Sequence, residues 1–254
     1  MRFELIEHDA VDSTSERAFA ALETRTARHG DVHTAREQTA GRGRRGASWA
    51  SARDEGLYLS VVLLPERAAH PGALTMAGGL AAFDAARELG LGRARLKWPN
   101  DLVVDAGGAR DDGSCAKLAG VLVETRGLDL ARPHYVLGIG MNVKQREFAA
   151  ELRAQRAVTS LGLCGIDIGV AKVREFVLAN LARRLDQVFA DDPRLCADFA
   201  AATDLAGREL DVECGEERLA GQFVELSLRG LVLRGADGAE LRCALEHVRA
   251  VRRR

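Results

Sequence analysis

The sequence has 254 residues, of which 47% are hydrophobic and 29% charged, and its formal net charge is −1 at pH 7. These values are typical of a globular protein and exclude a disordered or fibrous chain. They also argue against a general nucleic-acid binder, and no apolar run approaches the roughly 18 residues of a membrane span. We therefore expect a cytoplasmic protein with no membrane partner, built as one core plus a small appended domain.

The cysteines show no redox or metal-binding pattern. They lie far apart and include no CxxC pair; the five are Cys115, Cys164, Cys196, Cys214 and Cys243. Neither a disulfide framework nor a zinc site is indicated by this spacing. We expect reduced thiols, mostly buried, and no metal site made of protein side chains.

The first elements are predicted to be a strand, a polar turn and a helix. Residues 3–8 alternate between apolar and polar side chains, as in a short strand. Ser13 and Glu16 then have the spacing of a capping box, and the helix formers that follow run on to Gly30. We expect a helix over most of residues 13–30.

Two more strands flank an Arg/Gly loop. Residues 31–37 are typical of a strand, and residues 57–65 of a buried strand that Pro65 ends. The loop between them, residues 38–49, holds three arginines and three glycines within six positions. Such a loop is costly to order unless an anion orders it.

The next part of the chain adds a helix and three strands. Residues 74–90 have the apolar spacing of a helix, and the three strand-like segments are residues 94–105, 117–125 and 134–143. Residues 106–116 are rich in Gly and Asp, and we expect a mobile surface loop there. A long amphipathic helix is predicted over residues 169–189.

From about Leu205 the pattern changes to short alternating segments separated by glycine. Four strand-like segments follow, residues 208–214, 218–227, 231–235 and 240–254. They predict a small β-barrel-like domain. We therefore expect two domains, residues 1–204 and 205–254.

Four segments combine glycine with a cation or an amide near the end of a strand: residues 41–46, 97–101, 117–120 and 138–142. If these strand ends meet at one edge of the sheet, five cations surround one anionic ligand: Arg42, Arg44, Arg45, Lys97 and Lys117. A phosphate group fits that description. Each segment alone is weak evidence, because such loops and lone lysines are usually solvated.

Taken together, in this order and spacing, the motifs resemble those of biotin protein ligases. They are DSTS (12–15), EQTAGRGRRGASW (37–49), GLYLSV (56–61), KWPNDL (97–102), KLAGVLVE (117–124) and GIGMNV (138–143). The resemblance covers essentially the whole chain. It implies an α+β fold with a mixed sheet flanked by helices, as in class II synthetases, followed by an SH3-like barrel.

The resemblance also implies the reaction. Biotin's carboxylate attacks the α-phosphorus of ATP, with Mg²⁺, to give biotinyl-5′-AMP and pyrophosphate, and a lysine of a biotin carboxyl carrier protein then takes the biotin. The carrier would belong to acetyl-CoA carboxylase or another carboxylase. We expect a monomer or a homodimer with no nucleic-acid partner.

Site residues follow from the same resemblance. The biotin group comprises Ser13, Thr14, Ser15, Gln38, Arg42, Gly43, Arg44, Lys117 and Gly120, the first four being expected to bond the ureido head. The nucleotide group comprises Trp49, stacked on adenine, with Lys97, Asn100, Asp101 and Asn142. Lys117 and Arg44 are the expected catalytic residues, Lys117 first.

The sequence departs from the family pattern at three places. Ser15 stands where the family commonly has Asn, and Ala47 where it often has Arg. The spacing between Asp101 and Lys117 is also long. Because the chain starts almost directly at its first strand, we expect no N-terminal helix-turn-helix and no repressor role.

Two other functions stay open at this stage. A lipoate ligase or lipoyl/octanoyl transferase shares the fold and the acyl chemistry, but its Arg/Ser/Gly-Gly-Gly/His signature is absent while GRGRRG is present. A nucleic-acid-binding module is suggested by GRGRR, the terminal RRR and the barrel. Binding to RNA or DNA that depends on salt and ignores biotin would identify the module.

Overall fold

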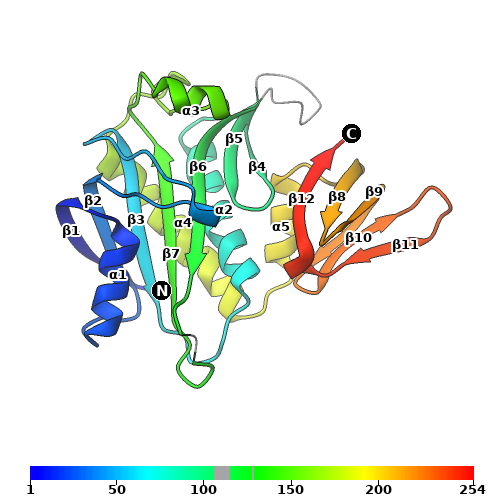
Figure 1. Ribbon diagram of the computed structural model, residues 1–254, viewed down its shortest axis with the longest axis horizontal. Coiled ribbons are helices and arrows are strands. Elements are labelled where there is room, and N and C mark those ends of the chain that lie inside the picture. Colours follow the sequence, from blue (N-terminus) through cyan, green and yellow to red (C-terminus); the bar gives the residue numbers. More distant parts are fainter. Residues whose placement is uncertain (106–114, 128) are drawn as a thin grey trace.

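The structure is a computed structural model that describes residues 1–105, 115–127 and 129–254. Its first part is a seven-stranded mixed sheet in the order β1-β2-β3-β7-β6-β5-β4 (Figure 1). The strands are β1 (Glu4–Val11), β2 (Asp31–Gln38), β3 (Gly56–Leu63), β4 (Ala94–Lys97), β5 (Asp101–Asp105), β6 (Cys115–Glu124) and β7 (Tyr135–Asn142). β1 and β2 are parallel, and the other neighbours are antiparallel. The predicted mixed sheet flanked by helices is confirmed.

Helices cover both faces of this sheet. The helices are α1 (Thr14–Glu23), α2 (Pro71–Glu88), α3 (Ala150–Gln155), α4 (Val170–Phe189) and α5 (Arg194–Ala202). α2 and α4 pack together in the large core over one face, where a Cβ on Gly78 would lie only 2.8 Å from Val121 Cγ1. On the other face Phe19 of α1 packs in a separate small cluster with Val62 and Val136. Alternate residues of β3 and β7 therefore face different helices.

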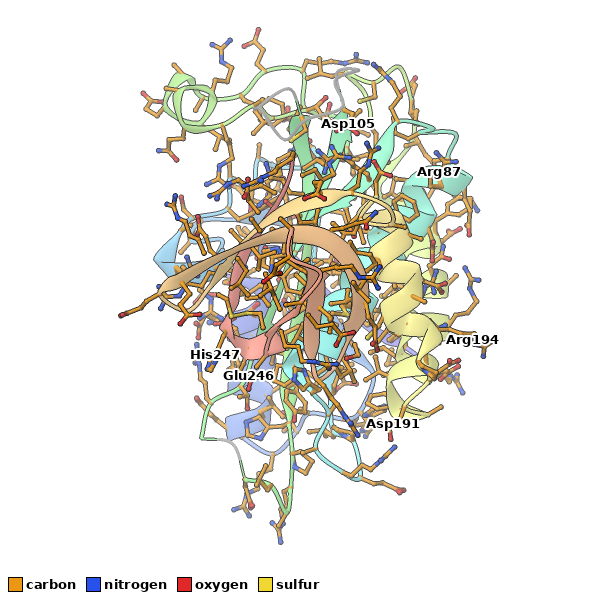
Figure 2. All side chains as sticks on the ribbon, turned by 90° about the vertical axis from the view of Figure 1, so that its right-hand side faces the viewer. Arg87, Asp105, Asp191, Arg194, Glu246 and His247 are labelled. Atoms are coloured by element: carbon orange, nitrogen blue, oxygen red, sulfur yellow. A yellow bond between two sulfur atoms is a disulfide. The ribbon has the colours of Figure 1, made fainter. Side chains whose placement is uncertain are left out.

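The second part is a five-stranded antiparallel sheet in the order β11-β10-β9-β8-β12, consistent with an SH3-like domain. Its strands are β8 (Glu209–Cys214), β9 (Glu217–Ser227), β10 (Gly230–Arg234), β11 (Glu240–Cys243) and β12 (Val248–Arg253). The short 3₁₀ turn η2 (Leu245–His247) joins the last two. Figure 2 is viewed from the side on which the second sheet lies. There α5 lies beside this sheet, with Arg194 in its first turn.

Trp98 connects the two parts. Its indole Nε1 donates a hydrogen bond to the carbonyl oxygen of Val248, at 3.2 Å, in the first residue of β12. Its ring also meets that of Phe199 of α5 edge-on, with 5.9 Å between centroids. The turn between β4 and β5 is thus fixed to the C-terminal strand.

Several predicted elements have other bounds. The first helix ends at Glu23 and not near Gly30, because Thr24 Oγ1 bonds back to the carbonyl of Ala20 at 2.9 Å and Arg25 then turns to φ 57°. The single strand predicted over residues 94–105 is a hairpin of β4 and β5, since Pro99 has no N–H to donate to a ladder.

Helices α3 and α5 were not predicted. Both are short, and α3 has no side-chain cap, whereas the start signal of α5 was overlooked: Asp192 Oδ1 accepts from the Arg194 N–H at 3.0 Å. Most of the loop predicted over residues 106–116 lies outside the described residues. Among the residues that the structure describes, no helix is both long and apolar enough to cross a membrane.

The prediction of five reduced cysteines was wrong for two of them. Cys214 at the end of β8 and Cys243 at the end of β11 form a disulfide, with 5.8 Å between their Cα atoms. The two are 29 residues apart, and only the folding of the second sheet brings them together. Cys115, Cys164 and Cys196 are free, and only Cys196 is buried.

Candidate active site

Three glycines leave a hollow on the face of the sheet that α1 covers. In the ladder Gly138 of β7 pairs with Ser60 of β3, and Gly140 pairs with Gly120 of β6. Residues paired across a ladder share a face, so side chains are missing from a contiguous patch beside Ser60. The patch forms the floor of a cavity.

This cavity has a volume of about 310 Å³. Its walls come from the start of α1, the Arg/Gly loop, the β4–β5 turn, β6, β7 and one residue of β12. The residues predicted for the site that line it are Ser13, Thr14, Ser15, Gln38, Arg42, Gly43, Arg44, Arg45, Trp49, Asn100, Asp101, Lys117 and Gly120. The fold therefore brings thirteen sequence-predicted residues to one place.

One end of the cavity is neutral and hydrogen-bonded. Gln38 Oε1 accepts from the Thr14 backbone N–H at 2.8 Å, and its Nε2 donates to Ser51 Oγ at 2.8 Å. Ser60 Oγ lies 2.8 Å from Thr14 Oγ1 and 3.0 Å from Ser15 Oγ. The hydroxyls are buried and the Gln38 amide is half-buried, and these groups can both donate and accept, so this end can bind a small polar group without charge.

The other end is cationic. Lys117 Nζ lies 2.6 Å from Asp101 Oδ1, and the two side chains are 14% and 25% exposed. Arg44 Nη1 donates to Asn100 Oδ1 at 3.2 Å, and Asn100 is itself held by its Nδ2, which donates to the Val121 carbonyl at 2.7 Å. Burial first, and then the neighbouring Arg45, lowers the pKa of the Arg44 guanidinium, which stays charged because arginine titrates far above neutral pH.

Trp49 lies between the two ends, against the glycine patch. A Cβ on Gly140 would come within 2.5 Å of Trp49 Cε2, and one on Gly120 within 3.2 Å of Trp49 Cζ3. Only glycine at position 140 leaves room for the indole. Lys117 Nζ is 5.3 Å from the centre of this ring, within the range of a cation–π contact.

Residues 41–49 of the Arg/Gly loop fold back on themselves. The Gly43 N–H donates to the Ala47 carbonyl at 2.7 Å, and the Trp49 N–H to the Gly41 carbonyl at 2.8 Å. A 3₁₀ turn, Arg44–Gly46, forms its tip and places Arg45 at φ 55°. The loop thus presents its arginines at one side of the cavity.

A second cavity of about 250 Å³ shares Trp49 and Lys117 with the first. It is bordered by apolar side chains around α3, among them Phe148 and Leu152. Asn142 lines it and donates from Nδ2 to the Thr159 carbonyl at 2.8 Å. A flat apolar group could occupy this cavity next to the cationic end of the first.

One predicted residue lies elsewhere. Lys97 lines neither cavity, and its Nζ is 3.7 Å from Cys115 Sγ. The lining residues that were not predicted include Ser60, Arg156 and Arg249. For Ser60 the signal was present, since the alternation of β3 sets it on the same face as the glycines, whereas Arg156 and Arg249 reach the cavity only through tertiary packing.

The fold and the cavity define a protein with a ligase-type α+β core and a C-terminal β-domain. Residues 8–142 match the sequence pattern of the Biotin/lipoate A/B protein ligase family, which is more than half of the chain. The chain belongs to this family.

Individual relatives support the assignment. The chain is 36% identical over 224 residues to the biotin–[acetyl-CoA-carboxylase] ligase of Paracoccus denitrificans, covering 84% of this chain and 87% of that protein. It is 35% identical over 196 residues to the Mycobacterium tuberculosis ligase of the same name, covering 72% and 65%. The match to the Escherichia coli bifunctional ligase/repressor BirA, 34% identical, spans 61% of this chain and 44% of BirA.

A solved structure resembles the whole chain. The biotin protein ligase of Aquifex aeolicus, in complex with biotin and ATP, superposes with a TM-score of 0.78 at 28% identity, and 99% of each chain is covered. The likeness therefore includes the C-terminal sheet as well as the core.

Proposed function

We propose that the protein is a biotin protein ligase, which joins biotin to AMP at the expense of ATP and then passes biotin to a lysine of a carrier protein. The observation that carries this proposal is a single cavity with a neutral hydrogen-bonding end and a cationic end. Relatives named as biotin ligases and a similar structure with biotin and ATP support it. The lipoate and nucleic-acid alternatives are not favoured by these relatives.

The neutral end would bind the ureido head of biotin. A ureido group has two N–H donors and one carbonyl acceptor, and the hydroxyls of Thr14, Ser15 and Ser60 with the Gln38 amide offer both kinds of partner. The valeryl chain would then cross the glycine patch. Its carboxylate would lie beside Lys117 at the cationic end.

The first reaction brings two anions together. A biotin carboxylate oxygen forms a bond to the α-phosphorus of ATP while the bond from that phosphorus to the pyrophosphate oxygen breaks. Lys117 and Arg44 would reduce the repulsion and stabilise the charge on the phosphoryl oxygens. In the second reaction a carrier lysine amine attacks the acyl carbon, AMP leaves, and the amine loses a proton.

The nucleotide would use both cavities. Its phosphates would lie at the cationic end of the first, and its base in the apolar second cavity beside Trp49 and Asn142. We propose Arg156, which lines both cavities, as a further cation for the phosphates.

Mg²⁺ fits this site with ATP as its main ligand. The described residues contain no group of three or more His, Cys, Asp or Glu that could hold a metal. Mg²⁺ needs no such cage, because it keeps several waters and is commonly held by substrate phosphates with one or two carboxylates. Asp101 would supply the carboxylate, and the ion would neutralise part of the triphosphate charge.

We further propose that residues 1–204 form the catalytic domain and residues 205–254 a separate C-terminal domain. The carrier would be a biotin carboxyl carrier domain of a carboxylase, such as acetyl-CoA carboxylase, and the reaction would take place in the cytoplasm, where ATP is available.

The test is pyrophosphate exchange into ATP that depends on biotin and Mg²⁺, measured with purified protein. We expect exchange with biotin, none with lipoate, and none after chelation of the metal. Addition of a carrier domain should yield AMP and pyrophosphate with biotin on one lysine. Release of ADP and phosphate, or exchange with lipoate alone, would contradict the proposal.

A further inference from the structure

Arg42 is held by two carboxylates that lie outside the Arg/Gly loop. Its Nη1 is 2.5 Å from Glu16 Oε1 in α1, and its Nη2 is 2.8 Å from Glu124 Oε2 at the end of β6. The three side chains are only 26% to 30% exposed. One guanidinium therefore ties the loop to a helix and to a strand that are far apart in the sequence.

A second arginine reinforces this arrangement. Arg126 Nη2 lies 2.5 Å from the same Glu16 oxygen, and its guanidinium stands 4.0 Å from the centre of the Phe19 ring. Phe19 is buried, so its ring holds the Arg126 guanidinium in place, and Arg126 in turn holds Glu16. Arg42, Glu16, Glu124 and Arg126 form what we call the loop anchor.

The charges of the loop anchor balance within the protein. Its two arginines face its two glutamates, and the hydrogen bond from Arg126 keeps the pKa of Glu16 below its usual range. The charge of Arg42 is thus taken up by carboxylates. The side chain of Arg44, two residues further on, donates only to the neutral Asn100 amide among the described residues and keeps its charge for a ligand.

Fixing Arg42 also fixes the base of the loop. Its backbone pairs with Ser48 in an isolated bridge, and the adjacent Gly41 carbonyl accepts from Trp49 N–H at 2.8 Å. The loop anchor therefore sets the position of the chain at both ends of the loop tip, including the indole that lies between the two cavities.

We propose that Glu16 and Glu124 are positioning residues that anchor the loop through Arg42, and that Arg42 serves the site through this anchor and not as a cation for the ligand. The inference rests on the proposed function, because the loop would close over biotinyl-5′-AMP. It predicts that a weakened anchor lets the loop open and the adenylate escape before transfer.

The first test uses Glu16→Gln and Glu124→Gln, which keep size and remove charge. In each variant, without ligand, hydrogen exchange at residues 41–49 should become about ten-fold faster, as expected for a partly buried ion pair. Release of preformed biotinyl-5′-AMP should accelerate by a similar factor. Glu66→Gln is the matched control, since Glu66 is an exposed residue with no ion pair among the described residues, and it should behave as wild type.

The second test is a double-mutant cycle with Arg42→Met. If Arg42 acts through the anchor, Glu124→Gln has no further effect on exchange or release once Arg42 is Met. If Arg42 contacts the ligand as a cation, the two effects multiply, and Arg42→Met slows adenylate formation far more than Glu124→Gln does. That result, or wild-type exchange in both glutamate variants, would overturn the inference.

Hydrogen exchange at residues 41–49 can be measured without substrate, so it tests this inference independently of the proposed function. A protein that fails to make the adenylate but shows faster loop exchange in Glu124→Gln would refute the function and retain the anchor. If the wild type makes the adenylate but loop exchange and adenylate release are unchanged in both glutamate variants, the function is retained and the anchor is refuted.

Discussion

Replacement of Lys117 by alanine should cut the rate of adenylate formation without unfolding the protein. The backbone of Lys117 donates to the Ala157 carbonyl and accepts from the Thr159 N–H, both at 2.9 Å, and the substitution keeps these bonds. Only the side chain is lost. Its charge lies at the cavity wall, 14% exposed and 2.6 Å from Asp101 Oδ1.

Two costs add in this variant. Loss of a preorganised charge that stabilises a developing anion typically lowers a rate by about 10² to 10³, or roughly 3 to 4 kcal/mol. The second cost is that Asp101 loses the ammonium group with which it pairs. Because Asp101 is also the carboxylate that we propose for Mg²⁺, Lys117→Ala with Asp101→Asn should be no faster than Lys117→Ala alone.

The assay is single-turnover formation of biotinyl-5′-AMP, with circular dichroism as the control for folding. Lys117→Arg should recover only part of the rate, because a planar guanidinium places its charge differently. We expect Lys117 to act by charge, since a protonated amine between anions is a poor nucleophile. A near wild-type rate in Lys117→Ala, or a covalent biotinyl adduct on Lys117 by mass spectrometry, would refute this reasoning.

Three further outcomes are expected. Arg44→Gly should loosen retention of the adenylate more than it slows its formation, so that lysines of bystander proteins become biotinylated; a variant that labels only the carrier would contradict this role. Hydrogen exchange across residues 41–49 should slow when biotin or its adenylate binds, and equal exchange with and without ligand would show that the ligand does not order the loop. His33 should make stability depend on pH, because burial first, and then nearby His8, lowers its pKa to about 4 from an ordinary 6.5. The unfolded chain binds this proton more readily between those values, so stability falls by about 2 to 3 kcal/mol as the pH drops from 6.5 to 4. Urea unfolding of His33→Gln should show a smaller fall over this range, and an identical pH profile would contradict the assignment.

The sequence predicted those parts of the site that are carried by local motifs. Ser13, Gln38 and Lys117 lie in short segments whose residue order is informative, and the strands that present them have clear apolar patterns. The glycines at the floor could also be found, because period-two alternation sets Gly138 and Gly140 on one face.

Other features depend on contacts that no local pattern encodes. Arg249 reaches the cavity because a strand of the second sheet packs beside the β4–β5 turn. Lys97 carries the right charge, but it ends β4 in the β4–β5 hairpin, where its ammonium group lies beside Cys115. The Cys214–Cys243 disulfide likewise joins strands that only the folded sheet brings together.

The bond between Trp98 and Val248 couples the position of the C-terminal sheet to the cavity. Trp98 comes two residues before Asn100, and Val248 comes directly before Arg249, so one hydrogen bond links two walls of the cavity. A substitution or a bound partner that displaces β12 would therefore also move the nucleotide side of the cavity, so the C-terminal sheet cannot be altered independently of the site.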